Sequence, residues 1–244
     1  MHSKFRLILL FSLLTVLSPL TVMAAAAIEE IVVKASYRET TLEKNDGSLM
    51  ILSEEQLKAE PMKHLEQLSF LVPNLNFALS DGRPRYFQIR GIGEQSGYEG
   101  TPNSSVGLMI DDIDFSGQGG ISSSFDMEQI EVHRGPQGSR MGANALAGMI
   151  YMRSKQPTDV FEGLSEFSLG SDGVRSVGVA FGGPLHDNSA IKYRVSIRND
   201  ESDGFRKNSY LNRDDTTGKD ELTVRLKLNH RPSADTELNV LIQK

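Results

Sequence analysis

Polar and apolar residues alternate with a period of two in the part of the chain that follows Pro157. In Ile191–Arg198 (IKYRVSIR), Ile, Tyr, Val and Ile alternate with Lys, Arg, Ser and Arg, and Leu222–His230 (LTVRLKLNH) repeats the pattern. Weaker versions occupy Val174–Phe181 and Glu237–Ile242. Because successive side chains of a strand point to opposite faces of a sheet, these runs predict strands with one polar and one apolar face.

The segments that join these strands help to distinguish two kinds of sheet. A soluble sandwich would turn its apolar faces inward, whereas a membrane barrel would turn them to lipid. Pro184–Ala190 and Arg231–Asp235 are short joints, and Asp200–Asp220 is long and charged. Short turns at one end and longer loops at the other are typical of outer-membrane barrels, so the pattern favours a barrel over a sandwich.

The N-terminus has the three parts of a secretory signal peptide. Lys4 and Arg6 precede the apolar run Leu7–Leu17, and small residues follow it (SPLTVMAAAA). We therefore predict a signal peptide over residues 1–26. A retained anchor is the alternative, but the apolar run is too short to span a bilayer as a helix. An exported chain of this kind is periplasmic, secreted or an outer-membrane barrel.

Composition argues against several classes of function. Hydrophobic residues make up 39% and charged residues 24% of the 244 residues, which is not the composition of a disordered chain. The net charge is −6 and no basic block is present, so we expect no nucleic-acid partner. There is no cysteine, and the five histidines are scattered without metal-ligand spacing. With no catalytic constellation in view, we expect no metal, no cofactor and no enzymatic activity.

Short strands and short helices are predicted between residues 47 and 157. Leu49–Leu52 reads as a strand, and Ser53 and Gln56 fit a capping box that begins a short helix. Further strands are expected at Leu75–Phe77, Tyr86–Ile89, Val106–Ile110, Ile130–His133 and Met149–Met152, and helical segments at Met62–Phe70 and Asp126–Gln129. This mixture predicts a compact α+β domain with a small mixed sheet.

Three glycine-containing segments resemble ligand-binding loops only loosely. The loop Gly91–Asn103 begins GxGxxxG, but no helix follows, as a dinucleotide site requires. Gly135–Gly138 lacks the Lys-Ser/Thr of a phosphate loop. Asp112–Gly117 begins like a calcium loop, but Ser123 stands where the bidentate glutamate belongs. These segments are better interpreted as structural loops.

The order of the motifs resembles that of TonB-dependent outer-membrane receptors of the siderophore type. EEIVVKA resembles a TonB box. YFQIRGIG, PNSSVGLMIDDIDF and FDMEQIEVHRGPQGSRMGANALAGMIYMRSKQP then resemble successive motifs of the plug domain, and FEGLSEFSLGSDGVRS resembles the opening of the barrel. The chain departs from the family pattern at Asp112, in place of a turn glycine, at His133, in place of leucine, and at Arg140 and Met141, in place of Leu-Tyr.

The resemblance implies an α+β plug domain followed by the first antiparallel strands of a transmembrane β-barrel. The expected division is a signal peptide over 1–26, a TonB box and mobile segment over 27–46, the plug over 47–157 and the start of the barrel over 160–244. The last part holds about four strands and a truncated fifth, whereas family barrels have about 22. We therefore expect the barrel to be incomplete and the chain to be an N-terminal fragment.

The family mechanism implies TonB, with ExbB–ExbD, as the partner that energises transport. The expected TonB box is Glu30, Ile31, Val32, Val33, Lys34 and Ala35. An extended, β-branched segment of this kind suits addition to the edge of a partner sheet. The alternative is that Ile31–Val33 is simply a strand of the plug.

Two further groups of plug residues are assigned roles by the resemblance. A ligand-facing loop is expected to present Gly91, Gly93, Gln95, Ser96 and Tyr98. Arg90 and Arg134 are expected to contact glutamates of the barrel wall that lie beyond Lys244, and so to lack their full set of carboxylate partners in this chain.

The resemblance implies a ferric siderophore or similar metal complex as the ligand, and outer-membrane lipid around the barrel. Cobalamin or a carbohydrate remains an alternative cargo. A soluble periplasmic binding module is another alternative, and a signalling receptor is disfavoured because the TonB box follows the signal peptide directly.

Overall fold

The structure is a computed structural model. It describes residues 32–35, 40–44, 47–59, 64–80, 83–96, 103–119, 123–186, 189–204, 206–213, 216–233 and 235–244. All of them lie in the compact unit Val32–Lys244. The predicted signal peptide lies outside the described residues.

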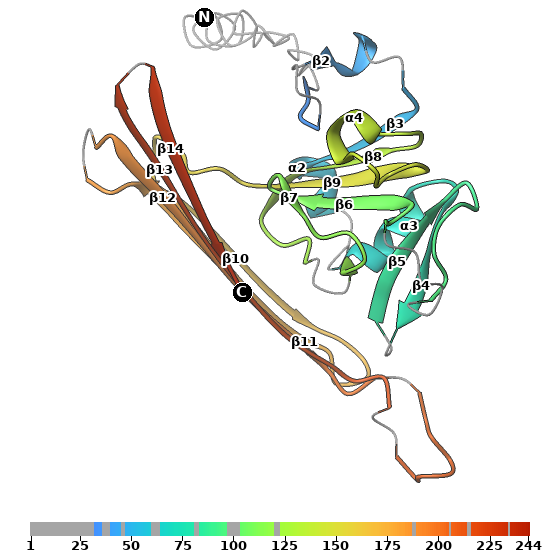
Figure 1. Ribbon diagram of the computed structural model, residues 1–244. Helices are drawn as coiled ribbons and strands as arrows, with labels where there is room; N and C mark the ends of the chain where they lie inside the picture. Colours follow the sequence, from blue (N-terminus) through green and yellow to red (C-terminus); the bar gives the residue numbers. More distant parts are fainter. Residues whose placement is uncertain are drawn as a thin grey trace, which may run out of the picture. The chain divides into compact units, whose positions relative to one another are not determined.

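A five-stranded mixed sheet organises the first half of the described chain (Figure 1). Its strands, in spatial order, are β3 (Leu49–Ser53), β8 (Met127–His133), β9 (Gly148–Ser154), β6 (Val106–Ile110) and β7 (Ile113–Asp114). β6 and β9 are parallel, and the other neighbours are antiparallel. The predicted small mixed sheet is therefore present.

Short elements surround this sheet. They are β1 (Val32–Val33), β2 (Thr40–Thr41), η1 (Leu42–Lys44), α2 (Glu54–Ala59), η2 (Leu65–Gln67), α3 (Leu68–Leu71), β4 (Leu75–Ser80), β5 (Arg83–Ile89) and α4 (Gly138–Met141). The predicted capping box opens α2: Ser53 N donates to Gln56 Oε1 at 3.0 Å, and Gln56 N donates to Ser53 Oγ at 3.4 Å. A second box, of His64 and Gln67, opens η2 and was not predicted.

The prediction of a helical turn over Asp126–Gln129 is wrong. β8 begins at Met127, and Gln129 pairs with Ser53 of β3 and Arg153 of β9. Asp126 has a φ of 58°, outside the right-handed helical region. Sheet pairing on both sides of β8 thus overrides the local preference.

Both faces of the central sheet are covered. One face carries the main core, in which Ile130, Val132 and Ile150 pack with residues of α2, α3 and β5. The opposite face carries a smaller cluster of Ala35, Met109, Ala145, Met149 and Tyr151. The N-terminal segment therefore contributes to a buried face of the plug sheet through Ala35.

The second half of the chain forms a five-stranded antiparallel meander (Figure 1). Its strands follow the sequence order: β10 (Glu162–Leu169), β11 (Arg175–Pro184), β12 (Ile191–Ser202), β13 (Lys219–Ser233) and β14 (Thr236–Gln243). The predicted alternating runs all lie within or nearly within these strands. β13 is longer than predicted because its charged start pairs with the end of β12, as in Ser202↔Lys219.

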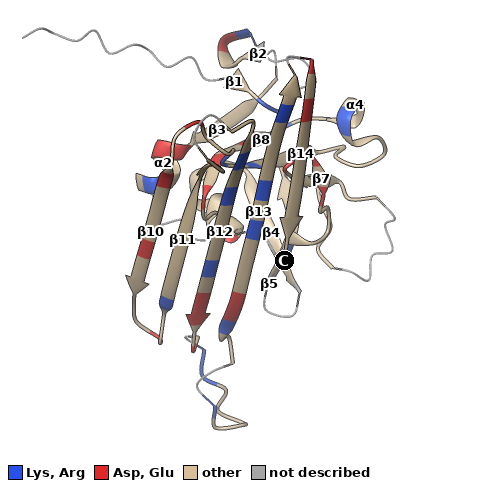
Figure 2. Ribbon diagram, turned by 90° about the vertical axis from the view of Figure 1, so that its left-hand side faces the viewer, with Lys and Arg blue, Asp and Glu red and all other residues tan. Residues whose placement is uncertain are grey.

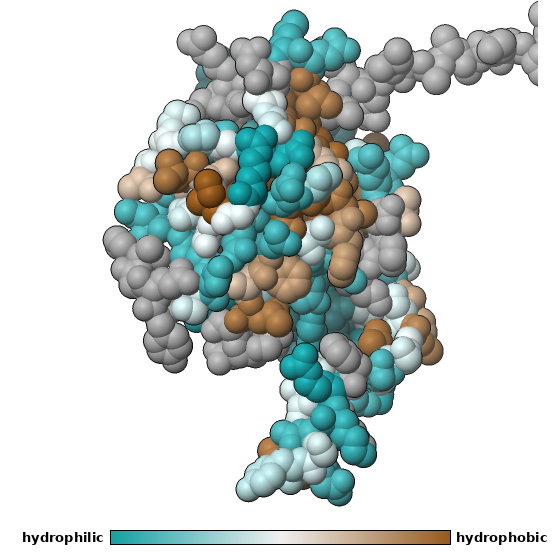
Figure 3. Space-filling model, turned by 90° about the vertical axis from the view of Figure 1, so that its right-hand side faces the viewer, coloured by the Kyte–Doolittle hydropathy of each residue, from teal (hydrophilic) through white to brown (hydrophobic). Residues whose placement is uncertain are grey.

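The burial of this meander is the reverse of that in a soluble sheet. Arg194, Arg198 and Arg225 are buried, with 3–4% of their surface exposed, whereas Phe167 and Ile242 are 69% and 58% exposed. Figure 2 shows the basic segments along β12 and β13. Figure 3 shows the side of the molecule that carries the mixed sheet, where hydrophilic and hydrophobic side chains are intermixed. Polar residues toward the plug and apolar residues outward characterise an outer-membrane barrel wall rather than a sandwich.

None of the helices in the described ranges has the length and apolar character needed to traverse a membrane.

Candidate functional site

Main-chain groups of the N-terminal segment are bound by side chains of β8. Lys34 N donates to Glu131 Oε1 at 2.5 Å, and Ala35 N donates to the same carboxylate at 3.1 and 3.3 Å. Gln129 Nε2 donates to Val32 O at 3.0 Å. Of the predicted TonB box, residues 32–35 are thus docked on the plug, and Glu30 and Ile31 lie outside the described residues. Their role as a TonB box stays a prediction.

The docked segment also forms a small sheet of its own. β1 pairs antiparallel with β2, in the register Val32↔Thr41 and Val33↔Thr40. Residues 40–44, which belong to the segment predicted to be mobile, form β2 and η1. Val33 is fully buried. The segment therefore has strand pairing, side-chain burial and main-chain hydrogen bonds to β8.

The predicted ligand-facing loop leaves β5 through two glycines with positive φ. Gly91 has a φ of 78° and Gly93 of 152°. A Cβ at Gly93 would lie 2.3 Å from Phe87 O, so this position requires glycine. Gln95 is exposed, Ser96 is half-buried, and Tyr98 lies outside the described residues. The ligand-facing role of this loop stays a prediction.

A buried carboxylate that was not predicted anchors this loop. Glu94 is 4% exposed, and its Oε1 accepts hydrogen bonds from Ser105 N at 2.9 Å and Ser105 Oγ at 2.7 Å. The loop is thereby tied to the residues just before β6. Its start is held in place, while Gly91 and Gln95 remain exposed.

The two arginines assigned to the barrel wall differ in their surroundings. Arg90 is exposed with a φ of 54°, and Arg134 is half-buried with an Nε that has no hydrogen-bond partner in the described part of the chain. Within those residues neither arginine forms an ion pair. Glu131, which could have satisfied them from inside the plug, instead binds Lys34 N and Ala35 N. Their contact with barrel glutamates stays a prediction.

A buried ion pair between the plug and the wall joins Asp126 and Arg194 of β12. Arg194 Nε donates to Asp126 Oδ2 at 2.8 Å, and Arg194 Nη2 donates to Asp126 Oδ1. The two side chains are 2% and 4% exposed. A bidentate, dehydrated pair of this kind fixes orientation as well as distance.

Phe125, next to this pair, packs against three wall strands. Its ring lies 5.1 Å from the guanidinium carbon of Arg198, which is cation–π distance. A Cβ at Gly178 of β11 would lie 2.7 Å from the ring, so the glycine makes room for it. Arg225 of β13 donates to Phe125 O at 3.4 Å. The two neighbouring residues Phe125 and Asp126 thus form one docking point of the plug on the wall strands.

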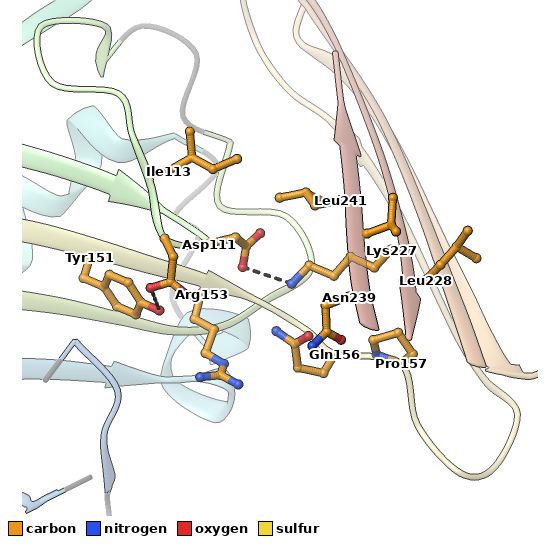
Figure 4. Close-up of a pocket in the computed structure, with 12 residues that line it drawn as sticks. Asp111, Ile113, Tyr151, Arg153, Gln156, Pro157, Lys227, Leu228, Asn239 and Leu241 are labelled. Carbon is orange, nitrogen blue, oxygen red and sulfur yellow. Dashed lines mark hydrogen bonds and ion pairs between the residues drawn. The ribbon is translucent and has the colours of Figure 1, made fainter. Parts of the chain in front are cut away.

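A second docking point lies at the turn between β6 and β7. Asp111 Oδ1 accepts from Lys227 Nζ of β13 and from Ser154 N, each at 2.9 Å. Figure 4 shows this ion pair at the edge of a cavity of about 260 Å³ between the turn and β13–β14. Asp111 and Asp112 have φ values of 48° and 69°, as a type I′ turn requires.

Two departures from the family pattern meet beside this turn. Arg140 Nη2 donates to Asp112 Oδ1, and Tyr151 Oη donates to the same oxygen at 3.1 Å. The Arg140 guanidinium carbon lies 5.1 Å from the centre of the Tyr151 ring. Burial, and then the charge of Asp112, hold the pKa of Tyr151 well above its usual value. The neutral phenol therefore serves as a hydrogen-bond donor that helps to hold the turn.

The docking residues Asp111, Phe125 and Asp126 were missed because their partners lie far away in the sequence. Arg194 is 68 residues from Asp126, and Lys227 is 116 residues from Asp111. The available signal was weak: Asp111 directly follows the apolar run Val106–Ile110, and basic residues lie on the polar side of the alternating strands. In the described ranges, no group of three or more His, Asp or Glu residues could hold a metal ion.

Comparison with known proteins supports this description. Residues 41–149 match the family model described as "TonB-dependent Receptor Plug Domain". The ferric enterobactin receptor PirA of Pseudomonas aeruginosa is 27% identical over 195 residues, which are 72% of this chain and 26% of PirA. The pesticin receptor of Yersinia pestis is 26% identical over 77% of this chain and 28% of its own length. The chain thus spans about a quarter of the length of these relatives.

Solved structures have the same fold. The ferric yersiniabactin uptake receptor FyuA of Yersinia pestis superposes with a TM-score of 0.72 at 24% identity, over 82% of this chain and 31% of FyuA. The pyoverdine outer membrane receptor FpvA of Pseudomonas aeruginosa also gives 0.72, at 17% identity, over 87% of this chain and 29% of FpvA.

The relatives named here are receptors rather than enzymes. The matched plug domain, the mixed sheet and the polar-lined wall strands agree with one another. We conclude that residues 41–149 of this chain are a TonB-dependent receptor plug domain, and that five antiparallel strands follow it.

Proposed function

We propose that this chain provides the plug and the first wall strands of an outer-membrane receptor that takes up a ferric siderophore or a similar metal complex. The observation that carries the proposal is the buried Asp126–Arg194 pair, which seats a family plug against a polar wall. In this proposal the plug closes the barrel lumen, and ligand binds above it at the loop that begins with Gly91. The division into a plug over 47–157 and wall strands over 160–244 belongs to the same proposal.

Energy for transport would come from TonB with ExbB–ExbD. The segment 32–35 supports this part of the proposal, because its first two residues, Val32 and Val33, already pair as a strand with β2. A partner sheet could take the place of β2 and of the side chains of β8. β-Strand addition uses main-chain hydrogen bonds, so the partner would not depend on particular side chains of the segment.

The proposed cargo class rests on the relatives. PirA is a ferric enterobactin receptor, and FyuA is a ferric yersiniabactin uptake receptor. The vitamin B12 transporter BtuB of Vibrio vulnificus, 28% identical over 111 residues, keeps cobalamin as the second candidate. The match to BtuB covers 46% of this chain and 18% of BtuB, whereas the match to PirA covers 72% of this chain. The longer match to PirA favours an iron complex as the cargo.

A growth assay separates the two cargo classes. Cells that lack their own iron-siderophore and cobalamin receptors are given the gene and tested with a panel of ferric siderophores and with cobalamin as limiting nutrients. We expect growth on at least one ferric siderophore and none on limiting cobalamin. Growth on cobalamin alone would contradict the iron-complex proposal.

Val32→Pro tests the role of the N-terminal segment. Proline removes the Val32 N–H and restricts φ, so it disturbs strand addition to a partner sheet. We expect ligand uptake to fall by about tenfold or more, the equivalent of about 1.4 kcal/mol, with ligand binding at the cell surface unchanged. Val32→Ala, which keeps the N–H, is the matched control. Normal uptake by the proline variant would rule out segment 32–35 as the TonB box.

A further inference from the structure

Three polar side chains lie at alternate positions of β8: Gln129, Glu131 and His133. They are 9%, 0% and 5% exposed. Alternation directs them away from Ile130 and Val132, which belong to the main core. They therefore lie on the sheet face that the N-terminal segment helps to cover.

These side chains bind one another as well as the segment. Gln129 Nε2 donates to Glu131 Oε1 at 2.9 Å, and His133 Nε2 lies 2.8 Å from Glu131 Oε2. With Glu131 ionised, the ring nitrogen donates this bond. We call Gln129, Glu131 and His133 the main-chain clamp.

Each contact given above between the clamp and the segment uses a backbone atom. Glu131 accepts from the N–H groups of Lys34 and Ala35, and Gln129 donates to the C=O of Val32. These are groups that an added strand of a partner would need. The clamp and a partner sheet therefore compete for the same groups, and one must release them before the other can bind.

Releasing the segment has a cost at Glu131. A carboxylate that is fully buried needs hydrogen-bond donors, and the segment supplies two of the residues that donate. When the segment leaves, the Glu131 carboxylate keeps only the hydrogen bonds from Gln129 and His133 among the contacts described above. Glu131 therefore favours the docked state more strongly than a neutral acceptor would.

We infer that the main-chain clamp is a binding site for residues 32–35, and that it sets how readily this segment becomes available to a β-strand-adding partner. Glu131 holds the segment directly, and His133 acts as a positioning residue that orients Glu131. The identity of the partner rests on the proposed function, whereas the holding of the segment does not.

The 244 residues contain no cysteine, so a thiol introduced here is the only one within this part of the receptor. Val33→Cys places a thiol at a fully buried position of the segment, and Ala147→Cys places one in the main core at a position that is 7% exposed. Each is made separately in the receptor, as the segment reporter and the core reporter. The rate of maleimide labelling of each reporter is measured in outer-membrane preparations without ligand or TonB.

Glu131→Ala is expected to raise the labelling rate of the segment reporter by about tenfold or more, with the rate of the core reporter unchanged. Glu131→Gln, which keeps the shape but replaces one acceptor oxygen with a donor, should give an intermediate rate. Glu128→Ala is the matched control, because this carboxylate of the same strand pairs with Arg153 rather than with the segment. It should leave both rates unchanged.

Two results would overturn the inference. An unchanged labelling rate of the segment reporter in Glu131→Ala would mean that the clamp does not hold the segment. An equal rise in the segment reporter and the core reporter would mean that Glu131 supports the fold of the whole plug rather than the docking of residues 32–35.

The positioning role of His133 has its own pair of variants. His133→Leu removes the ring nitrogen and should raise labelling of the segment reporter by a smaller factor than Glu131→Ala. His133→Gln retains a donor and should restore a rate close to that of the unmodified clamp. If both variants behave alike, His133 does not act through Glu131.

A second readout separates this inference from the proposed function. The purified periplasmic domain of TonB is added to the same membranes, and its binding to the Glu131→Ala receptor is compared with the unmodified receptor. Faster labelling together with stronger TonB-domain binding supports both. Faster labelling without any TonB-domain binding supports the clamp and contradicts the TonB-coupled function.

Discussion

Replacing Asp126 with alanine is expected to destabilise the seating of the plug by about 3–5 kcal/mol, because it leaves Arg194 buried without its bidentate partner. Phe125, the neighbouring residue, would lose its fixed position against Arg198 and Gly178. The cost arises from a buried charge that keeps only the more distant Glu162, 3.9 Å from Arg194 Nη1, as a counter-charge, rather than from the loss of attraction alone.

The urea midpoint of plug unfolding in the purified receptor, followed by protease sensitivity, measures this effect. Asp159→Ala is the matched control, because Asp159 pairs with Lys192 of the same wall strand but is 86% exposed. An exposed pair contributes about 0–1 kcal/mol, so the control should shift the midpoint little. Equal shifts for the two variants would contradict the assignment of Asp126 as a docking residue.

Gly148→Ala is expected to destabilise the plug by about 1–3 kcal/mol through overpacking. The added Cβ would lie 2.3 Å from His133 O and 2.6 Å from Ile89 Cδ1. His133 O belongs to β8, which pairs with β9, so relief of the clash would have to disturb the central sheet. Ile89 is buried in the main core and has little room to move.

Thermal unfolding of the purified receptor checks this prediction. Gly163→Ala is the control, since a Cβ on this strand glycine would meet only Ala180 O, at 3.9 Å. We expect a lowered plug transition for Gly148→Ala and an unchanged one for Gly163→Ala. No difference between the two variants would mean that the sheet adapts around position 148.

The wall strands could be predicted from the sequence because their signal is local. Alternation over a few residues is enough to place Ile191–Arg198 in β12 and Leu222–His230 in β13. The positions at which these strands end were predicted less accurately. Pairing with the neighbouring strand extends β12 to Ser202 and starts β13 at Lys219, and this depends on contacts between distant residues.

The docking residues and the clamp could not be predicted in the same way. The sequence places Asp126 in a helical turn, and it marks Arg194 only as a polar residue of an alternating strand. Glu131 is given no role by the sequence, yet in the structure its carboxylate accepts hydrogen bonds from Lys34 N and Ala35 N. A side chain that binds backbone atoms of a distant segment leaves no pattern in the sequence.

Three of the four departures from the family pattern, Asp112, His133 and Arg140, form specific side-chain contacts in the structure. Asp112 and Arg140 form an ion pair with each other, and His133 contacts Glu131. In the sequence, each departure is only a single residue that differs from the family pattern. In the structure, Asp112 and Arg140 help to hold one turn, and His133 belongs to the main-chain clamp.

The most direct test of the account is the uptake of radioactive iron, supplied as the ferric siderophore that supports growth, by cells with and without TonB. We predict that cells of both kinds bind the complex at the surface equally, and that only cells with TonB accumulate iron. Equal accumulation in both, or no surface binding in either, would contradict the proposal that this plug belongs to an energy-coupled ferric siderophore receptor.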